Sequence, residues 1–296
     1  MSIRHIVIAG PCVSEFGWEL MEWQGYVRCL SRGADSVIVC STAGFEPIYA
    51  DMNSIYIPHT IQCVRDAHRL HTKTVKNMPE LARVQAILNT YCINATKRKQ
   101  LVIRVDDTIK KLQRRPIGEQ VFIKYGDAAK AGTTYPLVIH ARNRPEPCQF
   151  GGDNYSSDNW ELLLNDLIAE GIVSDKAMIA AIGTKIAALA PSGVTDLRDI
   201  PIQQLMNILS AATLVIGPSS GPMHLASLCG TPHFVWATNC YQRTIGPGNR
   251  ERYITRWNPL NTKAHVVLHP KGQQLSPAVL AEAVIKFWHD VTGVHV

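Results

Sequence analysis

The sequence predicts an α/β protein made of two doubly wound, Rossmann-like domains that face a central cleft. Short apolar runs alternate with segments of helical periodicity almost from end to end, which is typical of mostly parallel sheets. The alternation passes through two cycles, separated by the small-residue and charged run at 126–134. We therefore expect an N-terminal domain at residues 1–130, a C-terminal domain at 131–275 and a final helix at 276–296.

The first cycle contains apolar runs that predict buried strands: Ile6–Ala9, Val37–Cys40 and Ile55–Ile57. The segment Glu19–Ser31 has helical character. Residues 79–95 predict a helix because their apolar residues recur on one face. A basic stretch follows, and then the apolar run Val121–Lys124.

The second cycle has its own predicted strands: Leu137–His140, Met178–Ile182, Leu214–Ile216, His233–Ala237 and Val266–Leu268. Asp158, with Glu161 three residues later, resembles a capping box that opens a helix to about Ala169. Apolar residues at helical spacing run from Ile202 to Ala212. Ser276 and Pro277 start the last helix.

The most informative segment leads from the strand Leu214–Ile216 through a small-residue turn, Gly217–Gly221, into a short helix. Pro222 fits the first helical position, where its missing N–H costs nothing. Gly230 fits the end of the helix, and the following Pro232 prevents its continuation. The first N–H groups of such a helix and the positive end of its dipole favour an anion.

Two other loops follow strands of the second cycle, His140-Ala-Arg-Asn-Arg144 and Gly183-Thr-Lys185. Ligands of doubly wound sheets bind beyond the carboxyl ends of the strands, so we expect these loops to converge on the same helix start. Charge-assisted hydrogen bonds from Arg142, Arg144 and Lys185 would each contribute about 1.5–3 kcal/mol to binding a diphosphate. The alternative is that the two arginines form ordinary surface ion pairs.

The stretch from Trp160 to Ala237 resembles the heptosyltransferase-like GT-B glycosyltransferases of family 9. The resemblance rests on three motifs: Ile182-Gly183, Leu197-Arg-Asp-Ile200, and Val215-Ile-Gly-Pro-Ser-Ser-Gly-Pro-Met-His-Leu-Ala226 followed by Gly-Thr-Pro232. It implies that the C-terminal domain holds a nucleotide-sugar and that the Gly-Pro-Met-His turn meets its phosphates. It also implies that the last helix packs back on the first domain. Ser219 stands where the family often has Asp.

Together, the three loops supply the residues expected at the donor phosphates: Arg142, Arg144, Lys185, Ser219, Ser220, Gly221 and His224. Gly183 and Thr184 would contact the nucleoside of a UDP- or ADP-linked sugar. We expect no cofactor and no metal, because the helix start and the basic side chains supply the positive charge. The alternative for His224 is packing against Trp236.

The loop after the first predicted strand carries the acid that the resemblance makes catalytic. The family's carboxylate falls on Glu15, with Glu19 in reserve, although Ser14 precedes it where the family usually has Gly. This base would take a proton from an acceptor hydroxyl as the hydroxyl attacks the anomeric carbon, and the resemblance implies inversion. Trp18 and Trp23 would stack on the acceptor. The alternatives are a capping role for Glu15 and a core role for the aromatic rings.

Two other functions remain open. Gly217-Pro-Ser219-Ser-Gly221 also matches the nucleophile elbow of α/β hydrolases, with Glu251 and either His265 or His269 as partners of Ser219. Against a hydrolase, no His-Gly-Gly-Gly motif is visible, and the basic residues would lack a purpose. The third reading is a nucleotide-binding protein without catalysis.

Charge suggests the kind of acceptor. Residues 97–115 hold eight Lys and Arg against two Asp, a surplus that equals the net charge of +6 of the whole chain. This cluster predicts a polyanionic acceptor, either the lipopolysaccharide core, another glycan or a hydroxymethylated DNA base. A short basic glycosyltransferase is also similar in type to phage enzymes that modify DNA. A solvated helical face is the alternative.

The remaining features bound the setting of the protein. The eight scattered cysteines, the absence of a signal peptide and the absence of an apolar run of membrane-spanning length predict a cytoplasmic protein with reduced thiols. His59, Cys63, His68 and His71 lie close in sequence but lack an acid or a cysteine pair. We therefore expect surface histidines there and not a metal site.

Overall fold

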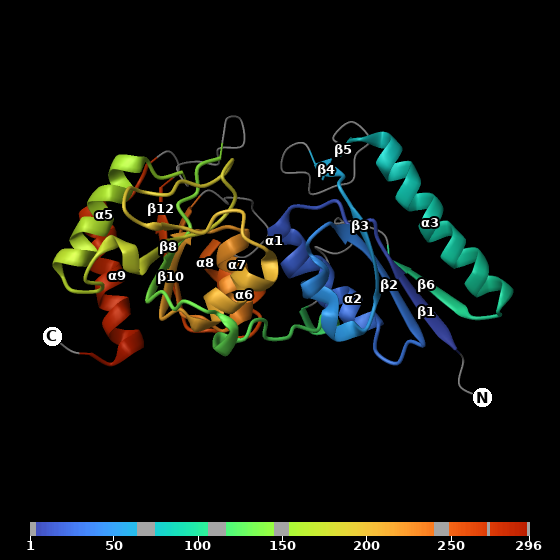
Figure 1. The fold of residues 1–296 in the computed structure, drawn as a ribbon. Helices are drawn as coiled ribbons and strands as arrows, with labels where there is room; N and C mark the ends of the chain where they lie inside the picture. The colour runs from blue at the N-terminus through green and yellow to red at the C-terminus, as the bar shows by residue number, and fades with distance from the viewer. Residues whose placement is uncertain are drawn as a thin grey trace. The chain divides into compact units, whose positions relative to one another are not determined.

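The computed structural model describes residues 4–63, 75–105, 117–144, 154–239, 249–270 and 273–294. The chain divides into two compact units, Met1–Phe122 and Ile123–Val296. Each unit contains a parallel sheet with helices packed on it, which confirms the predicted α/β class (Figure 1).

The first unit has a four-stranded parallel sheet of order β3-β2-β1-β6. Its strands are β1 (His5–Ala9), β2 (Ser36–Thr42), β3 (Ile55–His59) and β6 (Leu101–Val105). Ala9 pairs with both Val39 and Val105, so the loop after β1 leaves the sheet at its carboxyl edge. A separate antiparallel ladder joins β4 (Gln62–Cys63) to β5 (Val75–Lys76).

A helical stretch connects β1 to β2. It consists of α1 (Phe16–Trp18), the π-helical segment η1 (Glu19–Trp23) and α2 (Gln24–Leu30). The 3₁₀ segment η2 (Glu46–Met52) follows β2, and α3 (Met78–Lys97) precedes β6. The predicted apolar face of α3 is buried against the sheet through Leu81, Val84 and Leu88, as the helical spacing required.

One strand of this unit was not predicted. Strand β6 lies in the stretch that we assigned only to a basic cluster, because its arginine obscures the apolar pattern. The apolar run Val121–Lys124, to which we assigned no element, forms no strand, and the Val121 N–H donates to the carbonyl of Gly25 on α2. The 3₁₀ segment η3 (Ile117–Glu119) lies just before this run.

The second unit has a six-stranded parallel sheet of order β12-β11-β10-β7-β8-β9. Its strands are β7 (Leu137–Ile139), β8 (Ile179–Ala181), β9 (Thr195–Asp196), β10 (Leu214–Pro218), β11 (His233–Thr238) and β12 (Ala264–His269). The central strands are buried on both faces, which explains why they read as continuous apolar runs.

The helices of the second unit are α5 (Ser157–Ala169), α6 (Ile202–Ala211), α7 (Gly221–Cys229), α8 (Asn249–Arg256) and α9 (Pro277–Thr292). Two 3₁₀ segments, η4 (Ala128–Lys130) and η5 (Lys176–Met178), accompany them. The predicted capping box of α5 was misplaced. Ser156 is the N-cap and accepts a hydrogen bond from Asn159 N, whereas Glu161 forms an ion pair with Lys176.

The division of the chain also differs from the expected one. The boundary lies at Phe122 and Ile123, ahead of the predicted linker, because residues of that run pack within the second unit. A Cβ on Gly126 would lie 2.2 Å from the carbonyl oxygen of Met206 on α6. We expected α9 to pack on the first domain. Instead, its apolar face joins the core of the second unit, and the helix lies beside α5 (Figure 1).

Among the residues described above, no helix combines the length and the apolar character needed to cross a membrane.

Candidate functional site

The strand order of the second unit brings the predicted donor loops together. β10, β7 and β8 are neighbours and parallel, so the loops that follow them leave from one edge of the sheet. The contact is direct between two of these loops. Ser220 Oγ and His140 Nδ1 share a buried hydrogen bond of 2.8 Å. This bond links the start of α7 to the segment that carries Arg142 and Arg144.

His140 sits in a slot made by two glycines. A Cβ on Gly183 would lie 3.0 Å from the imidazole ring, and a Cβ on Gly217 would lie 3.1 Å from His140 Cβ. Burial, together with the smaller effect of the positive charges of Arg142 and Arg144, lowers the pKa of His140 to about 3. The imidazole is therefore neutral near pH 7, and two guanidinium groups lie within electrostatic reach of it.

The backbone around the two arginines is held from both sides. Asn143 N donates to the carbonyl of Ala187 at 2.8 Å, and Arg142 forms an antiparallel bridge with Ala188. Asn154 holds Arg144, because its Oδ1 accepts from Arg144 N and its Nδ2 donates to Arg144 O at 2.7 Å. Only 5% of the Arg142 surface is exposed, which does not fit an ordinary surface ion pair.

Helix α7 has the predicted strand–turn–helix form and ends at Gly230, which has the left-handed φ of 75°. It starts at Gly221, so Pro222 is its second residue. Ser220 is the N-cap, with no hydrogen bond from its side chain to the helix. Ser219 is held by its backbone, since its N–H donates to the carbonyl of Trp236 at 2.8 Å.

The side chain of His224 belongs to an aromatic cluster. Its ring centroid lies 4.9 Å from that of Trp257 and 5.6 Å from that of Tyr253. Burial is the main reason that the pKa of His224 falls to about 3. Trp236 packs instead against Trp160 at 5.5 Å, so the expected partner of His224 was wrong although packing itself is observed. This environment favours a structural role for His224.

The loop after β8 is braced by a residue that we did not predict. Asp199 N donates to the carbonyl of Gly183 at 2.9 Å, and Asp199 Oδ1 accepts from Lys185 N at 3.3 Å. Thr184 and Lys185 are both exposed. Asp199 lies in the Leu197-Arg-Asp-Ile200 motif, so the motif was the available signal. Asn154 had no such signal, because its partner Arg144 is ten residues away in sequence.

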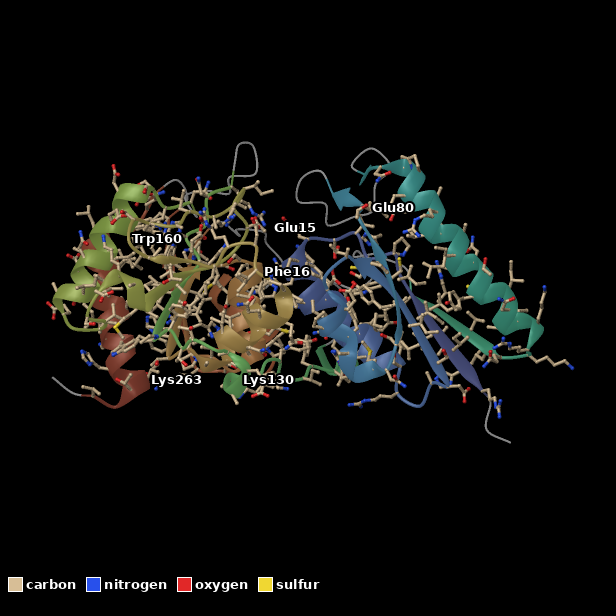
Figure 2. All side chains as sticks on the ribbon, viewed as in Figure 1. Glu15, Phe16, Glu80, Lys130, Trp160 and Lys263 are labelled. Atoms are coloured by element: carbon tan, nitrogen blue, oxygen red, sulfur yellow. The ribbon has the colours of Figure 1, made fainter. Side chains whose placement is uncertain are left out.

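In the first unit, Glu15 follows β1 at the carboxyl edge of the sheet (Figure 2). Hydrogen bonds hold this loop to the neighbouring strands. Cys12 N donates to the carbonyl of Cys40 at 2.9 Å. His59 Nε2 lies 2.7 Å from the Cys12 carbonyl, while His59 Nδ1 accepts from Ile61 N. Glu15 is half-buried and occupies the N-cap position of α1, but its side chain makes no capping hydrogen bond. The capping alternative is therefore not what the structure shows.

The other acidic and aromatic candidates occupy different environments. Glu19 is completely buried, and its Oε1 accepts hydrogen bonds from Ser41 Oγ and, at 2.5 Å, from Tyr49 OH. Trp23 is also in the core, with 1% of its surface exposed, so its predicted contact with an acceptor was wrong. Trp18 is only half-buried. Glu15 and Trp18 thus remain the candidates with access to solvent.

In the described part of the chain, the contacts do not favour the hydrolase triad that we considered as an alternative. The serine that shares a hydrogen bond with a histidine is Ser220 and not Ser219. His265 stacks on Phe234 with a centroid distance of 5.2 Å, and strand β11 separates its strand β12 from β10. The Nε2 of His140 faces Gly183 at close range, where a triad would place a carboxylate.

The basic cluster divides between two parts of the chain. Lys97, Arg98 and Lys99 are exposed at the end of α3, just before β6. Because β6 is parallel to β1, these three residues lie at the amino edge of the sheet, opposite the Glu15 loop (Figure 1). Arg104 lies on β6. The other charged residues of the cluster lie outside the described residues: Asp106, Asp107, Lys110, Lys111, Arg114 and Arg115.

The histidines that suggested a metal site are only partly described. His59 is buried and hydrogen-bonded, contrary to the expected surface position. His68 and His71 lie outside the described residues, as does the side chain of Cys63. Within the described ranges, no three His, Cys, Asp or Glu residues form a group that could hold a metal ion.

Comparison with known proteins identifies the fold. No family model and no curated sequence matches the chain. Among solved structures, E. coli ADP-heptose LPS heptosyltransferase II is similar over 97% of this chain and 99% of its own, with a TM-score of 0.58 and 13% identity. A glycosyl transferase of family 9 from Veillonella parvula is similar over 98% and 99%, with a TM-score of 0.57 and 12% identity. E. coli heptosyltransferase WaaC with ADP is similar over 96% and 99%, with a TM-score of 0.51 and 13% identity. The chain therefore has the GT-B fold of the heptosyltransferases over nearly its whole length.

Proposed function

We propose that this protein is a glycosyltransferase that moves a sugar from a nucleoside-diphosphate donor to an acceptor hydroxyl, with inversion and without a divalent metal. The observation that carries the proposal is the 2.8 Å hydrogen bond between His140 and Ser220, which joins a loop with two arginines to the start of α7. A fold alone does not establish a function, so the argument rests on this edge of the sheet.

The donor half of the mechanism is electrostatic. As the bond to the anomeric carbon breaks, negative charge grows on the departing nucleoside diphosphate. Arg142, Arg144 and Lys185 and the first N–H groups of α7 would stabilise that charge. Pro222 has no N–H and shapes the turn without donating. Gly183 and Thr184, on the neighbouring loop, would contact the nucleoside.

The acceptor half needs a base. Glu15 would accept the proton of the acceptor hydroxyl as the oxygen attacks the anomeric carbon. Support for this assignment comes from the position of Glu15, a half-buried residue on a loop held by hydrogen bonds to Cys40 and His59. Trp18, close along the chain, would offer an apolar face to the acceptor sugar.

The names of the similar structures suggest the first ligands to test. Two of those proteins are named for ADP-heptose or were solved with ADP, so we propose an ADP-linked sugar before a UDP-linked one. The acceptor we propose is a phosphorylated glycan such as the lipopolysaccharide core, after the heptosyltransferase named for LPS. DNA is the competing polyanion, and its binding would weaken steeply as salt is raised.

A thermal-shift panel of ADP-, UDP-, GDP- and CMP-linked sugars tests the proposal, because a ligand that binds only the folded state raises its stability. The selected donor should lose most of its effect in Arg144→Ala. Arg83→Ala is the matched control, since Arg83 is an exposed arginine of the first unit that pairs with Glu80. No shift with any donor, or equal losses in both variants, would contradict a donor site at this edge.

Chemistry separates the alternatives. With the selected donor, a glycosyltransferase releases nucleoside diphosphate in proportion to the sugar transferred. A nucleotide-binding protein without catalysis would bind the donor with no turnover. A serine hydrolase would be labelled by a fluorophosphonate probe at Ser219 or Ser220.

A further inference from the structure

Ser220 differs from two other serine N-caps in the same unit. Ser156 at α5 and Ser276 at α9 each accept a hydrogen bond from the N–H three residues along, at 3.1 and 3.4 Å. Ser220 also has an extended backbone, with φ −167° and ψ 168° where both other serines have a φ of −65°, and its side chain makes no such bond. Its Oγ lies instead 2.8 Å from His140 Nδ1.

This difference matters for the first turn of α7. An N-cap oxygen can accept from the second or third residue of the helix. The second residue is Pro222, which has no N–H, so a capping Ser220 could serve only Met223 N. That same N–H, with Gly221 N, is what an anion at the helix start would use. A Ser220 that caps α7 would therefore compete with the anion.

The setting of His140 is suited to hold the hydroxyl in place. His140 is buried, with 5% of its surface exposed, and it lies so close to Gly183 and Gly217 that a Cβ on either glycine would contact it at 3.0–3.1 Å. The neutral ring keeps one nitrogen without a proton, and it adds no further positive charge beside Arg142. The backbone of His140 is fixed as well, because its N–H donates to the carbonyl of Ile216 at 2.9 Å.

We propose that His140 is a positioning residue that holds Ser220 Oγ away from the first turn of α7 and so keeps the Met223 N–H open for the diphosphate of the donor. The identity of the anion as a donor diphosphate rests on the proposed function, whereas the effect of His140 on the orientation of Ser220 does not depend on it. Loss of the ring nitrogen should let Ser220 turn and cap α7, so protection of the helix start should rise while affinity for the anion falls.

Two variants separate the effect of losing the hydrogen-bonding nitrogen from the effect of changing the volume of the side chain. His140→Leu removes both nitrogens, whereas His140→Asn places an amide atom near the position of Nδ1 and should behave like the wild type. In the ligand-free protein, amide exchange of Met223, followed by NMR, should become about tenfold slower in His140→Leu, as expected of a gained cap bond. Should His140→Leu fail to fold, His140→Phe takes its place.

The same proteins are titrated with ADP and with UDP by calorimetry. The dissociation constant should rise about tenfold in His140→Leu, the loss of one charge-assisted hydrogen bond. In the double variant with Ser220→Ala, affinity should return to that of Ser220→Ala alone, because no hydroxyl remains to compete. Such recovery would not follow from a packing defect at residue 140.

The outcomes are distinguishable. Unchanged exchange of Met223 in His140→Leu overturns the proposal, and so does a loss of affinity that persists in the double variant. If the wild-type protein binds neither nucleotide, the proposed function fails for these donors. The exchange of Met223 then decides by itself whether His140 controls Ser220.

Discussion

Replacing Glu15 by glutamine separates a chemical role of this side chain from a structural one. The amide keeps the size of the carboxylate but cannot accept a proton. A general base contributes about 10²–10⁴-fold to a rate, so kcat should fall by that factor, or about 3–5.5 kcal/mol in the activation free energy. Because Glu15 is half-buried and the amide keeps its size, the free energy of unfolding should change by no more than about 0.5 kcal/mol.

Glu19→Gln is the matched comparison, four residues away on the same helical stretch. Glu19 Oε1 accepts from two buried hydroxyls, those of Ser41 and Tyr49. Weakening these hydrogen bonds should cost about 1–3 kcal/mol of stability. Any loss of kcat in this variant should follow the fraction of folded protein.

The assay is release of nucleoside diphosphate from the donor selected by thermal shift, with acceptor present, alongside equilibrium urea unfolding. A Glu15→Gln protein with a kcat within about threefold of the wild-type value would refute the assignment of Glu15 as a general base. A folded but inactive Glu19→Gln protein would transfer the role to Glu19.

Three further results are expected. Arg142→Lys keeps the charge but loses the planar fork, so the dissociation constant of the donor should rise about tenfold by calorimetry; an unchanged value would remove Arg142 from the site. Gly183→Ala should lower the free energy of unfolding by about 2–4 kcal/mol, because its φ is +120° and the new Cβ would lie 2.9 Å from Ala188 Cβ. Gly44→Ala is the control, since Gly44 has a φ of +90° but nothing within 4 Å of an added Cβ, so it should lose only about 1 kcal/mol; equal losses would exclude crowding as the cause. Finally, burial lowers the pKa of His140 from 6.5 to about 3, so the folded state resists protonation. The unfolded chain gains a proton below about pH 6.5, so the free energy of unfolding should fall by up to about 1.4 kcal/mol for each pH unit as the pH is lowered. His140→Asn should reduce, by the share of one histidine, the fall of the urea midpoint between pH 7.5 and 5, because the buried His224 and His233 also have lowered pKa values. The same fall of the midpoint in both proteins would contradict this.

Much of the fold could be read from local patterns. The apolar runs of β1, β2, β10 and β11 are long enough and pure enough to predict buried strands, and the face of α3 follows helical spacing. Glycine and proline at the ends of α7 predicted its limits to within one residue. Strands β9 and β6 lacked such a pattern. β9 has only two residues, and an arginine interrupts the apolar run of β6, so neither shows a recognisable periodicity.

The order of strands explains why the donor loops could be predicted only in part. Local sequence indicated that loops after three strands carry basic or small residues, and a parallel sheet brings such loops to one edge. Only the tertiary structure decided that His140 meets Ser220, that Glu19 and Trp23 turn inward while Glu15 stays half-buried, and that α9 joins the second core. These outcomes depend on contacts between residues far apart in the chain, and burial of a side chain is set by the neighbours that pack on it rather than by its own sequence context.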